Sequence, residues 1–266
     1  MKRIISLVLA AALMLTALFM FTACDVKETI VVGYTIYEPM NYIDGEGNLV
    51  GFDTELAKAV FEKLGYSPVF KKIEWSQKYT ELDGGTISCI WNGFTANTAD
   101  SDGVARSAKV DFSYNYMRNK QVIVTTAELA ATITDASSFA GKIGAVETGS
   151  AGDTFLTDEL TGAVRSGVQS QLDAMRDLSL GTAHFAVVDD QLAQTYVGKG
   201  DYANLVIVET VSGTEEFYAI GFKKGSDLTA KVNQALEELA ADGTIARLAE
   251  KYGVSNTAIT DFSSQK

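Results

Sequence analysis

Strand-like and helix-like segments alternate along this chain, and the alternation occurs twice. In the first round, helices at 52–65 and 76–85 separate strands at 29–35, 68–73 and 86–91. The second round spans roughly residues 142–200, with strands at 142–147, 163–168 and 184–188. Strands that are joined through helices pair in parallel. The pattern therefore predicts an α/β protein with two similar βαβαβ-based sheets, each flanked by helices.

Two long β-like runs, 120–126 and 216–224, stand on either side of the second round. They are natural crossings between two lobes. The helix that follows, in 226–243, has one apolar stripe and is expected to pack back on the first lobe; the stripe consists of Leu228, Val232, Leu236 and Leu239. We therefore predict a discontinuous lobe 1, at 30–120 plus 214–266, and a lobe 2 at 121–213.

The N-terminal segment has the features of a secretory signal peptide. Lys2 and Arg3 precede an apolar run from Ile4 to Phe21, and the tetrapeptide FTAC ends it at Cys24. FTAC resembles the lipobox of bacterial lipoproteins, which implies removal of residues 1–23, lipidation of Cys24 and a tether at 24–29. The predicted location is the cell membrane, on its extracytoplasmic face. The alternative is an uncleaved membrane anchor, because the apolar run is about long enough to span a bilayer.

Charge and composition exclude several classes of function. Without Lys2 and Arg3 the chain has 20 basic and 34 acidic residues, a net charge of −14, which repels nucleic acid. A single histidine and one further cysteine, Cys89, cannot form a metal-ligand cluster, and we expect Cys89 to fill the core. The sequence contains neither a GxSxG motif nor a glycine-rich phosphate loop. We predict no cofactor, no metal and no catalytic residue.

Polar and aromatic residues follow the carboxyl ends of the predicted strands, where ligands bind in open α/β sheets. In the first round these residues are Tyr37, Trp75, Asn92, Gly93 and Thr95. In the second round Gly149 and Ser150 begin a helix, whose free N–H groups favour an anion. Asp189, directly after a buried strand, can hold an ammonium group. Together these residues suit a zwitterion.

Other polar residues have simpler interpretations. Asp53 is expected to cap the helix at 52–65, and Asp190 to cap the helix that follows it. Lys78, one turn after Trp75, is expected in solvent, with contact to an acidic ligand as the alternative. His184, the only histidine, is expected to have a structural role.

The ordered set of motifs resembles bacterial extracellular solute-binding proteins, family 3, of the amino-acid-binding type. The motifs include GNLVGFDTELAKAVFEKLG, IEWSQKYTEL, GTISCIWNGFT, ETGSAGD and AVVDDQ, and the resemblance covers nearly all of the mature chain. It implies a type II periplasmic-binding-protein-like fold, in which two lobes joined by two hinge strands close on one free amino acid. It also implies a monomer that delivers its ligand to the membrane subunits of an ABC importer.

The resemblance assigns roles to individual residues. Tyr37 and Trp75 correspond to aromatic walls, and Asp189 to the acid that binds the α-ammonium group. The family's segment that holds both the ammonium and the carboxylate group of the ligand corresponds to Asn92, Gly93 and Thr95. Its carboxylate cradle corresponds to Gly149, Ser150 and Ala151.

The family's carboxylate-binding arginine corresponds to Arg106, with Arg118 as a weaker substitute. The stretch between Thr95 and Arg106 is longer than in the family pattern, and Asn115 replaces the usual proline. Two alternatives remain open for the function. One is a sensor input protein, and the other is a dehydratase-like enzyme on the same fold, for which Glu147 is a candidate acid.

Overall fold

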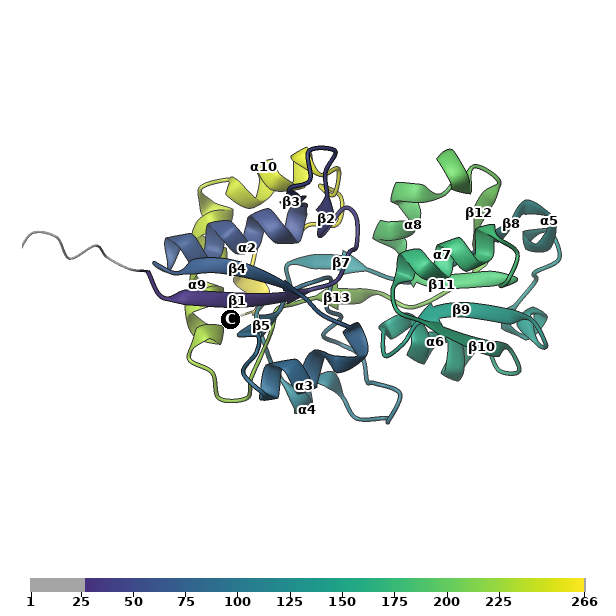
Figure 1. The fold of residues 1–266 in the computed structure, drawn as a ribbon, viewed down its shortest axis with the longest axis horizontal. Coiled ribbons are helices and arrows are strands. Elements are labelled where there is room, and N and C mark those ends of the chain that lie inside the picture. The colour runs from purple at the N-terminus through teal and green to yellow at the C-terminus, as the bar shows by residue number, and fades with distance from the viewer. Residues whose placement is uncertain (1–26, 266) are drawn as a thin grey trace, which may run out of the picture.

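The computed structural model describes residues 27–265. The chain forms two lobes side by side, each built around a five-stranded sheet (Figure 1). In lobe 1 the strand order is β4 (Ser67–Lys72), β1 (Thr29–Tyr34), β5 (Cys89–Ile90), β14 (Gly221–Phe222), β6 (Asp111–Phe112). In lobe 2 it is β10 (Val164–Val168), β9 (Ile143–Glu147), β11 (Phe185–Asp189), β8 (Gln121–Thr126), β12 (Leu205–Ser212). The predicted α/β, two-lobed fold is confirmed.

The two sheets share one design. Strand β1 pairs in parallel with β4 and β5, and β9 pairs in parallel with β10 and β11. An antiparallel strand then extends each sheet, β14 beside β5 and β8 beside β11. Because the parallel strands point the same way, their carboxyl ends meet at one edge of each sheet, as the sequence pattern predicts.

Helices follow the strands in the expected places, and each lobe has one further short helix that was not predicted. In lobe 1 they are α2 (Phe52–Lys63), a 3₁₀ turn (Trp75–Gln77), α3 (Lys78–Asp83) and α4 (Arg106–Lys109). In lobe 2 they are α5 (Ala127–Ala130), α6 (Ala151–Glu159), α7 (Gln171–Ser179) and α8 (Asp190–Tyr196). The helices that were not predicted are α4 in lobe 1 and α5 in lobe 2. Within the described residues, each helix is too short or too polar to cross a membrane.

The lobes are connected through a short ribbon. Strand β7 (Met117–Asn119) pairs antiparallel with β13 (Glu216–Tyr218), so that Asn119 lies opposite Glu216. The chain enters lobe 2 directly after β7 and returns directly before β13 (Figure 1). The chain therefore crosses between the lobes at the starts of the two β-like runs that the sequence predicts, 120–126 and 216–224. Beyond its start, the first run forms β8 inside lobe 2.

The C-terminal helices complete lobe 1. Helix α9 (Leu228–Ala241) packs on α2 and on α10 (Thr244–Lys251). Val232, Leu236 and Leu239 are buried in the same core as Leu56 and Val60 of α2. The apolar stripe thus packs on lobe 1, as predicted.

Two predicted helix caps are wrong. Gly51, not Asp53, occupies the N-cap position of α2, and the Asp53 carboxylate is buried in lobe 1 instead. Asp190 lies inside the first turn of α8 and accepts a hydrogen bond from Gln194, while Asp189 occupies the N-cap position.

The structure agrees with two further expectations. Nδ1 of His184 accepts a hydrogen bond from the backbone N–H of Ile143, at 2.9 Å. Cys89 is buried in the core of lobe 1.

Candidate functional site

A small enclosed cavity lies between the lobes. Five residues of lobe 1 line it, Trp75, Asn92, Gly93, Thr95 and Arg106, together with five of lobe 2, Glu147, Ser150, Ala151, Gln171 and Asp189. All the predicted site residues except Tyr37 and Gly149 are among them. The cavity volume is about 10 Å³, room for about one water molecule. The lobes are therefore closed on each other, and a larger ligand can enter only when they separate.

Gly93 presents bare backbone to the cavity. Its φ is +55°, and a Cβ atom there would lie 2.7 Å from Cε1 of Tyr37. Its N–H donates to the buried Asp53 carboxylate at 2.8 Å, and Tyr116 donates to the same oxygen at 2.9 Å. Asp53 thus fixes the backbone at the cavity. Tyr37 lies behind Gly93, where its hydroxyl contacts that of Tyr218 at 2.8 Å.

The side chain of Asn92 is held within lobe 1. Its amide group donates to the carbonyl of Thr35 and to Oδ1 of Asn41, at 3.0 and 2.7 Å, and its oxygen accepts from the Thr35 hydroxyl. Asn92 therefore stabilises the turn after β5. Trp75 packs edge-on against Phe94, with ring centroids 5.4 Å apart.

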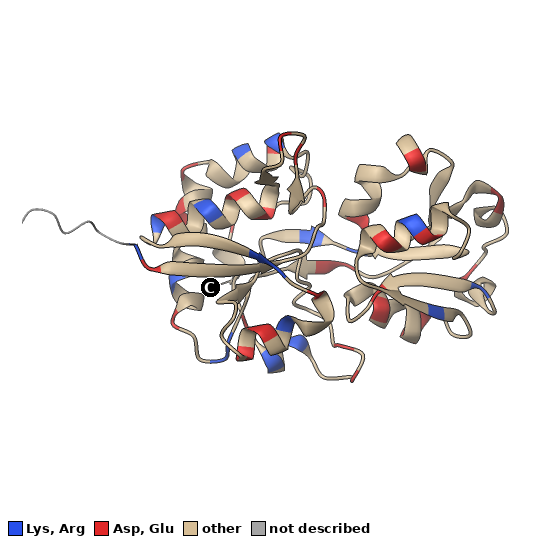
Figure 2. Ribbon diagram, viewed as in Figure 1, with Lys and Arg blue, Asp and Glu red and all other residues tan. Residues whose placement is uncertain are grey.

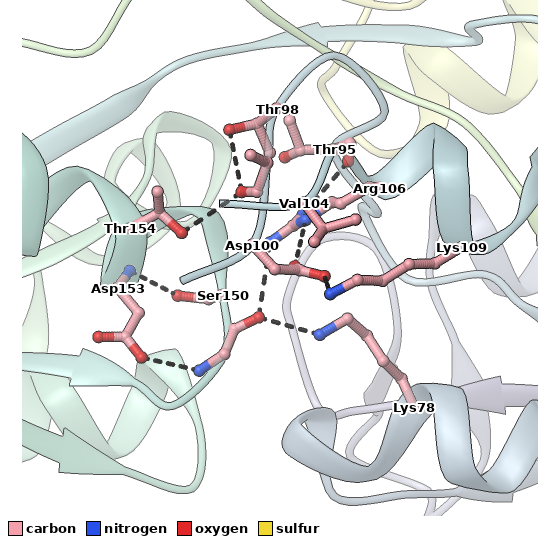
Figure 3. Close-up of polar contacts among 12 residues, drawn as sticks. Lys78, Thr95, Thr98, Asp100, Val104, Arg106, Lys109, Ser150, Asp153 and Thr154 are labelled. Atoms are coloured by element: carbon pink, nitrogen blue, oxygen red, sulfur yellow. Dashed lines mark hydrogen bonds and ion pairs between the residues drawn. The ribbon is translucent and has the colours of Figure 1, made fainter. Parts of the chain in front are cut away.

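Arg106 reaches the cavity from the start of α4. Its side chain is 1% exposed, and its guanidinium lies 5.3 Å from the centroid of the Phe94 ring. Nε donates to Asp100 at 2.8 Å, and one terminal nitrogen donates to the carbonyl of Thr95 at 3.2 Å (Figure 3). The side chain of Arg118 is 52% exposed and lies beside Glu215. Arg106, rather than Arg118, therefore has the position for a carboxylate clamp.

The long stretch before Arg106 forms a compact loop that carries Asp100. Ala99 pairs with Ala105, and the N–H of Asp100 donates to the carbonyl of Val104 at 3.0 Å. The Asp100 carboxylate also accepts from Lys109 at 2.8 Å and from the Tyr79 hydroxyl at 2.7 Å. Burial alone would raise the pKa of Asp100, but Arg106 and Lys109 hold it below its ordinary value. The loop thus supplies the counter-ion of Arg106.

The first turn of α6 forms part of the lobe 2 wall. Ser150 occupies the N-cap position, and its hydroxyl accepts from the N–H of Asp153 at 3.1 Å. Gly149, with φ +77°, contributes its carbonyl, which accepts from Lys78 at 3.0 Å. The N–H groups at the start of a helix lack partners within the helix and favour an anion. This end of the cavity can therefore hold a carboxylate.

Lys78 differs from the expectation of a solvated side chain. It is buried between the lobes, and its ammonium group lies over the rings of Trp75 and Tyr79, at 5.0 and 4.7 Å. Burial lowers its pKa to about 7. It does not line the enclosed cavity but faces a wider opening beside it, which Lys109 and Arg165 also line.

Side-chain amides surround Asp189. Its Oδ1 accepts from Asn119 and Gln121, each at 2.6 Å, and its Oδ2 accepts from Gln171 at 2.5 Å. Burial raises the pKa of Asp189, and the amides oppose the increase. A carboxylate has about four acceptor positions. Three amides take most of these positions, and the Tyr218 hydroxyl also hydrogen-bonds to the carboxylate, so an ammonium group would compete with these donors for Asp189.

Glu216 of the β7–β13 ribbon shares these donors. It accepts from Gln121 at 2.9 Å, and from Asn119 and Thr95 at 3.2 Å each. Burial raises its pKa to about 7. Sequence reasoning missed the amide residues and Glu216. It considered Glu147 only as a candidate acid of an enzyme, although Glu147 is the last residue of β9 and follows the same strand-end rule as Asp189.

Acidic and basic residues are interspersed on both lobes in the view of Figure 2. Within residues 27–265, no group of three or more histidine, cysteine or acidic side chains is arranged to hold a metal ion.

Comparisons with known proteins agree on one family. The family model of bacterial extracellular solute-binding proteins, family 3, matches residues 30–255. The arginine-binding extracellular protein ArtP of Bacillus subtilis is 26% identical over 95% of this chain and 98% of its own length. The L-cystine-binding protein TcyJ of Escherichia coli K12 is 28% identical over 85% of this chain and 84% of its own. An ancestral arginine-binding protein solved with arginine has a TM-score of 0.76 and 30% identity, over 85% of this chain and 98% of that one.

Proposed function

Because this chain belongs to the bacterial extracellular solute-binding proteins of family 3, we propose that it captures a free amino acid in the cleft between its lobes. The observation that carries the proposal is the charge arrangement of the cavity. Arg106 of lobe 1 and Asp189 of lobe 2 line the same enclosed space. One can bind the α-carboxylate of an amino acid and the other its α-ammonium group.

The geometry supports a role for each of these residues. Arg106 and the first turn of α6, with Ser150 and Ala151, hold the carboxylate. Asp189 accepts from the ammonium group, and Thr95 lines the same cavity beside it. Trp75 forms the aromatic wall. Tyr37 acts indirectly, because it supports the backbone at Gly93.

Binding works through a shift in the population of closed molecules. We propose that lobe 1 (30–120 and 214–266) and lobe 2 (121–213) rotate about the β7–β13 ribbon. Polar contacts across the cleft are made by Lys78 with Gly149 and by Tyr196 with Glu38, at 3.0 and 2.8 Å. The cavity of about 10 Å³ is too small for an amino acid, so the ligand-bound lobes lie slightly farther apart than here. A ligand contacts both lobes only when they approach each other, so it favours the closed over the open form.

We further propose that the protein is a monomeric lipoprotein that serves an ABC importer. Residues 1–23 would be removed, Cys24 lipidated and 24–29 left as a tether; residues 1–26 lie outside the described part of the chain. The closed form would dock on the importer's membrane subunits. Replacement of Cys24 by serine tests the anchor, and the variant should then be released from the membrane fraction.

Titration of the protein with a panel of amino acids tests the binding proposal. Asp189→Ala should weaken the binding of the preferred amino acid by roughly 30-fold or more, because truncation of a buried charge pair costs about 2–5 kcal/mol. Asp190→Ala is the matched control, since its carboxylate bonds only to Gln194 among the side chains described. Equal affinities of the wild type and the Asp189 variant would refute the assignment.

A further inference from the structure

We propose that the cleft selects amino acids whose side chain carries a second positive charge, and that Glu147 receives that charge. The inference rests on the proposed function, because it concerns the same cleft. It adds the chemical class of the ligand and a residue that determines specificity.

Glu147 occupies the position that the two ends of a zwitterion leave free. It is the last residue of β9, and its side chain lines the cavity beside Ser150 and Asp189. The cavity has three charged lining residues among those described, Arg106, Asp189 and Glu147. With the α-carboxylate at Arg106 and the α-ammonium group at Asp189, Glu147 is the charged group left for the ligand side chain.

The carboxylate of Glu147 lacks the support that its neighbours have. Glu147 is 4% exposed, and its Oε1 has no hydrogen-bond partner among residues 27–265. Asp189, in contrast, accepts from three amides, and Glu216 from Gln121 and Thr95. Native proteins leave few buried acceptors without a donor. A donor on the ligand would supply the missing partner.

The charges around Glu147 favour a cation as that donor. Burial, together with Asp189 and Asp173, raises the pKa of Glu147 to about 8, while Lys78 and Arg106 act in the opposite direction. Both of these cations bond elsewhere, Arg106 to Asp100 and Lys78 to the Gly149 carbonyl. A guanidinium or ammonium group on the ligand would offset the burial of the carboxylate. An acidic side chain would bring another negative charge beside Glu147 and Asp189.

The wider opening beside the cavity does not favour an acidic ligand. Three basic residues line it, Lys78, Lys109 and Arg165. Lys109 pairs with Asp100 and Asp102, and Arg165 pairs with Asp153. Lys78 donates to the carbonyl of Gly149 (Figure 3). These cations are therefore already matched by acceptors of the protein.

Calorimetric titration of the full-length protein in detergent tests the inference with two nearly isosteric ligands. L-arginine carries a positive side chain, and L-citrulline has almost the same shape without the charge. The wild type should bind L-arginine or L-lysine at least roughly 30-fold more tightly than L-citrulline. Glu147→Gln keeps the shape of the side chain and should reduce this preference to within roughly threefold.

Glu159→Gln serves as the matched control, because Glu159 is an exposed acid at the end of α6 that does not line the cavity. It should preserve the preference for L-arginine over L-citrulline. A wild-type preference that Glu147→Gln leaves unchanged would overturn the inference. Binding of neutral or acidic amino acids in place of cationic ones would also overturn it, but the proposed function would stand. A protein that binds no amino acid would refute both.

Discussion

The buried carboxylate of Asp53 makes the stability of this protein depend on pH in an unusual direction. Burial raises the pKa of Asp53 to about 7, although Gly93 and Tyr116 donate hydrogen bonds to its Oδ2. Its other oxygen has no hydrogen-bond partner among the described residues. The native state therefore binds a proton at Asp53 more tightly than the unfolded state does.

The sign and size of the effect follow from this difference. An aspartate in an unfolded chain has a pKa of about 3.9, so the native and unfolded states differ by about three pKa units. Because the native state binds more protons, the free energy of unfolding decreases as the pH rises between about 4 and about 7. Each pKa unit corresponds to about 1.4 kcal/mol. The range from pH 5 to pH 8 covers about two of the three units, so the free energy of unfolding decreases by about 3 kcal/mol over this range.

Urea denaturation of the wild type and of Asp53→Asn at pH 5 and pH 8 measures this contribution. The variant cannot ionise at residue 53, so its free energy of unfolding should decrease by about 3 kcal/mol less than that of the wild type over this range. The other buried acids with a raised pKa, Glu147, Asp189 and Glu216, titrate in both proteins and cancel in the comparison. Asp83→Asn, at an exposed position of lobe 1, should behave as the wild type does. The same pH dependence in wild type and Asp53→Asn would refute the reasoning.

Three further predictions concern the cleft. Gly93→Ala should destabilise the protein by about 1–3 kcal/mol and weaken ligand binding, because φ is positive at this residue and the new Cβ atom would meet the Tyr37 ring. Thermal unfolding measures the loss. Gly85→Ala is the control and should have a smaller effect, because φ is also positive there but the surrounding space is open. Arg106→Lys should weaken amino-acid binding by roughly 10- to 100-fold in calorimetry, because lysine lacks the planar fork that binds a carboxylate. The affinity for L-arginine should rise by roughly 20-fold from pH 6.5 to pH 8.5, because Glu147 ionises in the free protein over this range. Glu147→Gln should show a smaller rise in affinity. An equal or larger rise in the variant would contradict the role of Glu147.

The architecture could be predicted from sequence because its signals are local. Each strand and helix of the parallel units has its own periodicity, and the carboxyl ends of parallel strands meet at one edge. This rule brought Trp75, Gly93, Ser150 and Asp189 to the same cavity. The antiparallel strand β12 was not predicted. Nothing in the sequence of residues 205–212 indicates that this segment pairs with β8 and forms the edge of the lobe 2 sheet.

The surroundings of the charged groups could not be predicted in the same way. Asn119, Gln121 and Gln171 come from three elements, β7, β8 and α7, and only their tertiary arrangement brings three amides to Asp189. Asp53 shows a related problem. An aspartate at the start of a helix has the sequence signature of a cap, but here Gly51 takes that position and the carboxylate supports Gly93.

The loop between Thr95 and Arg106 orients the arginine and also reaches the opposite lobe. Its Asp100 holds Nε of Arg106, which leaves the two terminal nitrogens on the side of Thr95 and Gly149. Its Ala99 carbonyl accepts from Thr154 of lobe 2 at 3.4 Å, so the loop also contacts the opposite lobe. An arginine clamp that is held by such a loop is oriented before the ligand arrives, and less conformational freedom is lost on binding. The contact between Ala99 and Thr154 forms only when the lobes meet, so the loop favours the closed form together with the ligand.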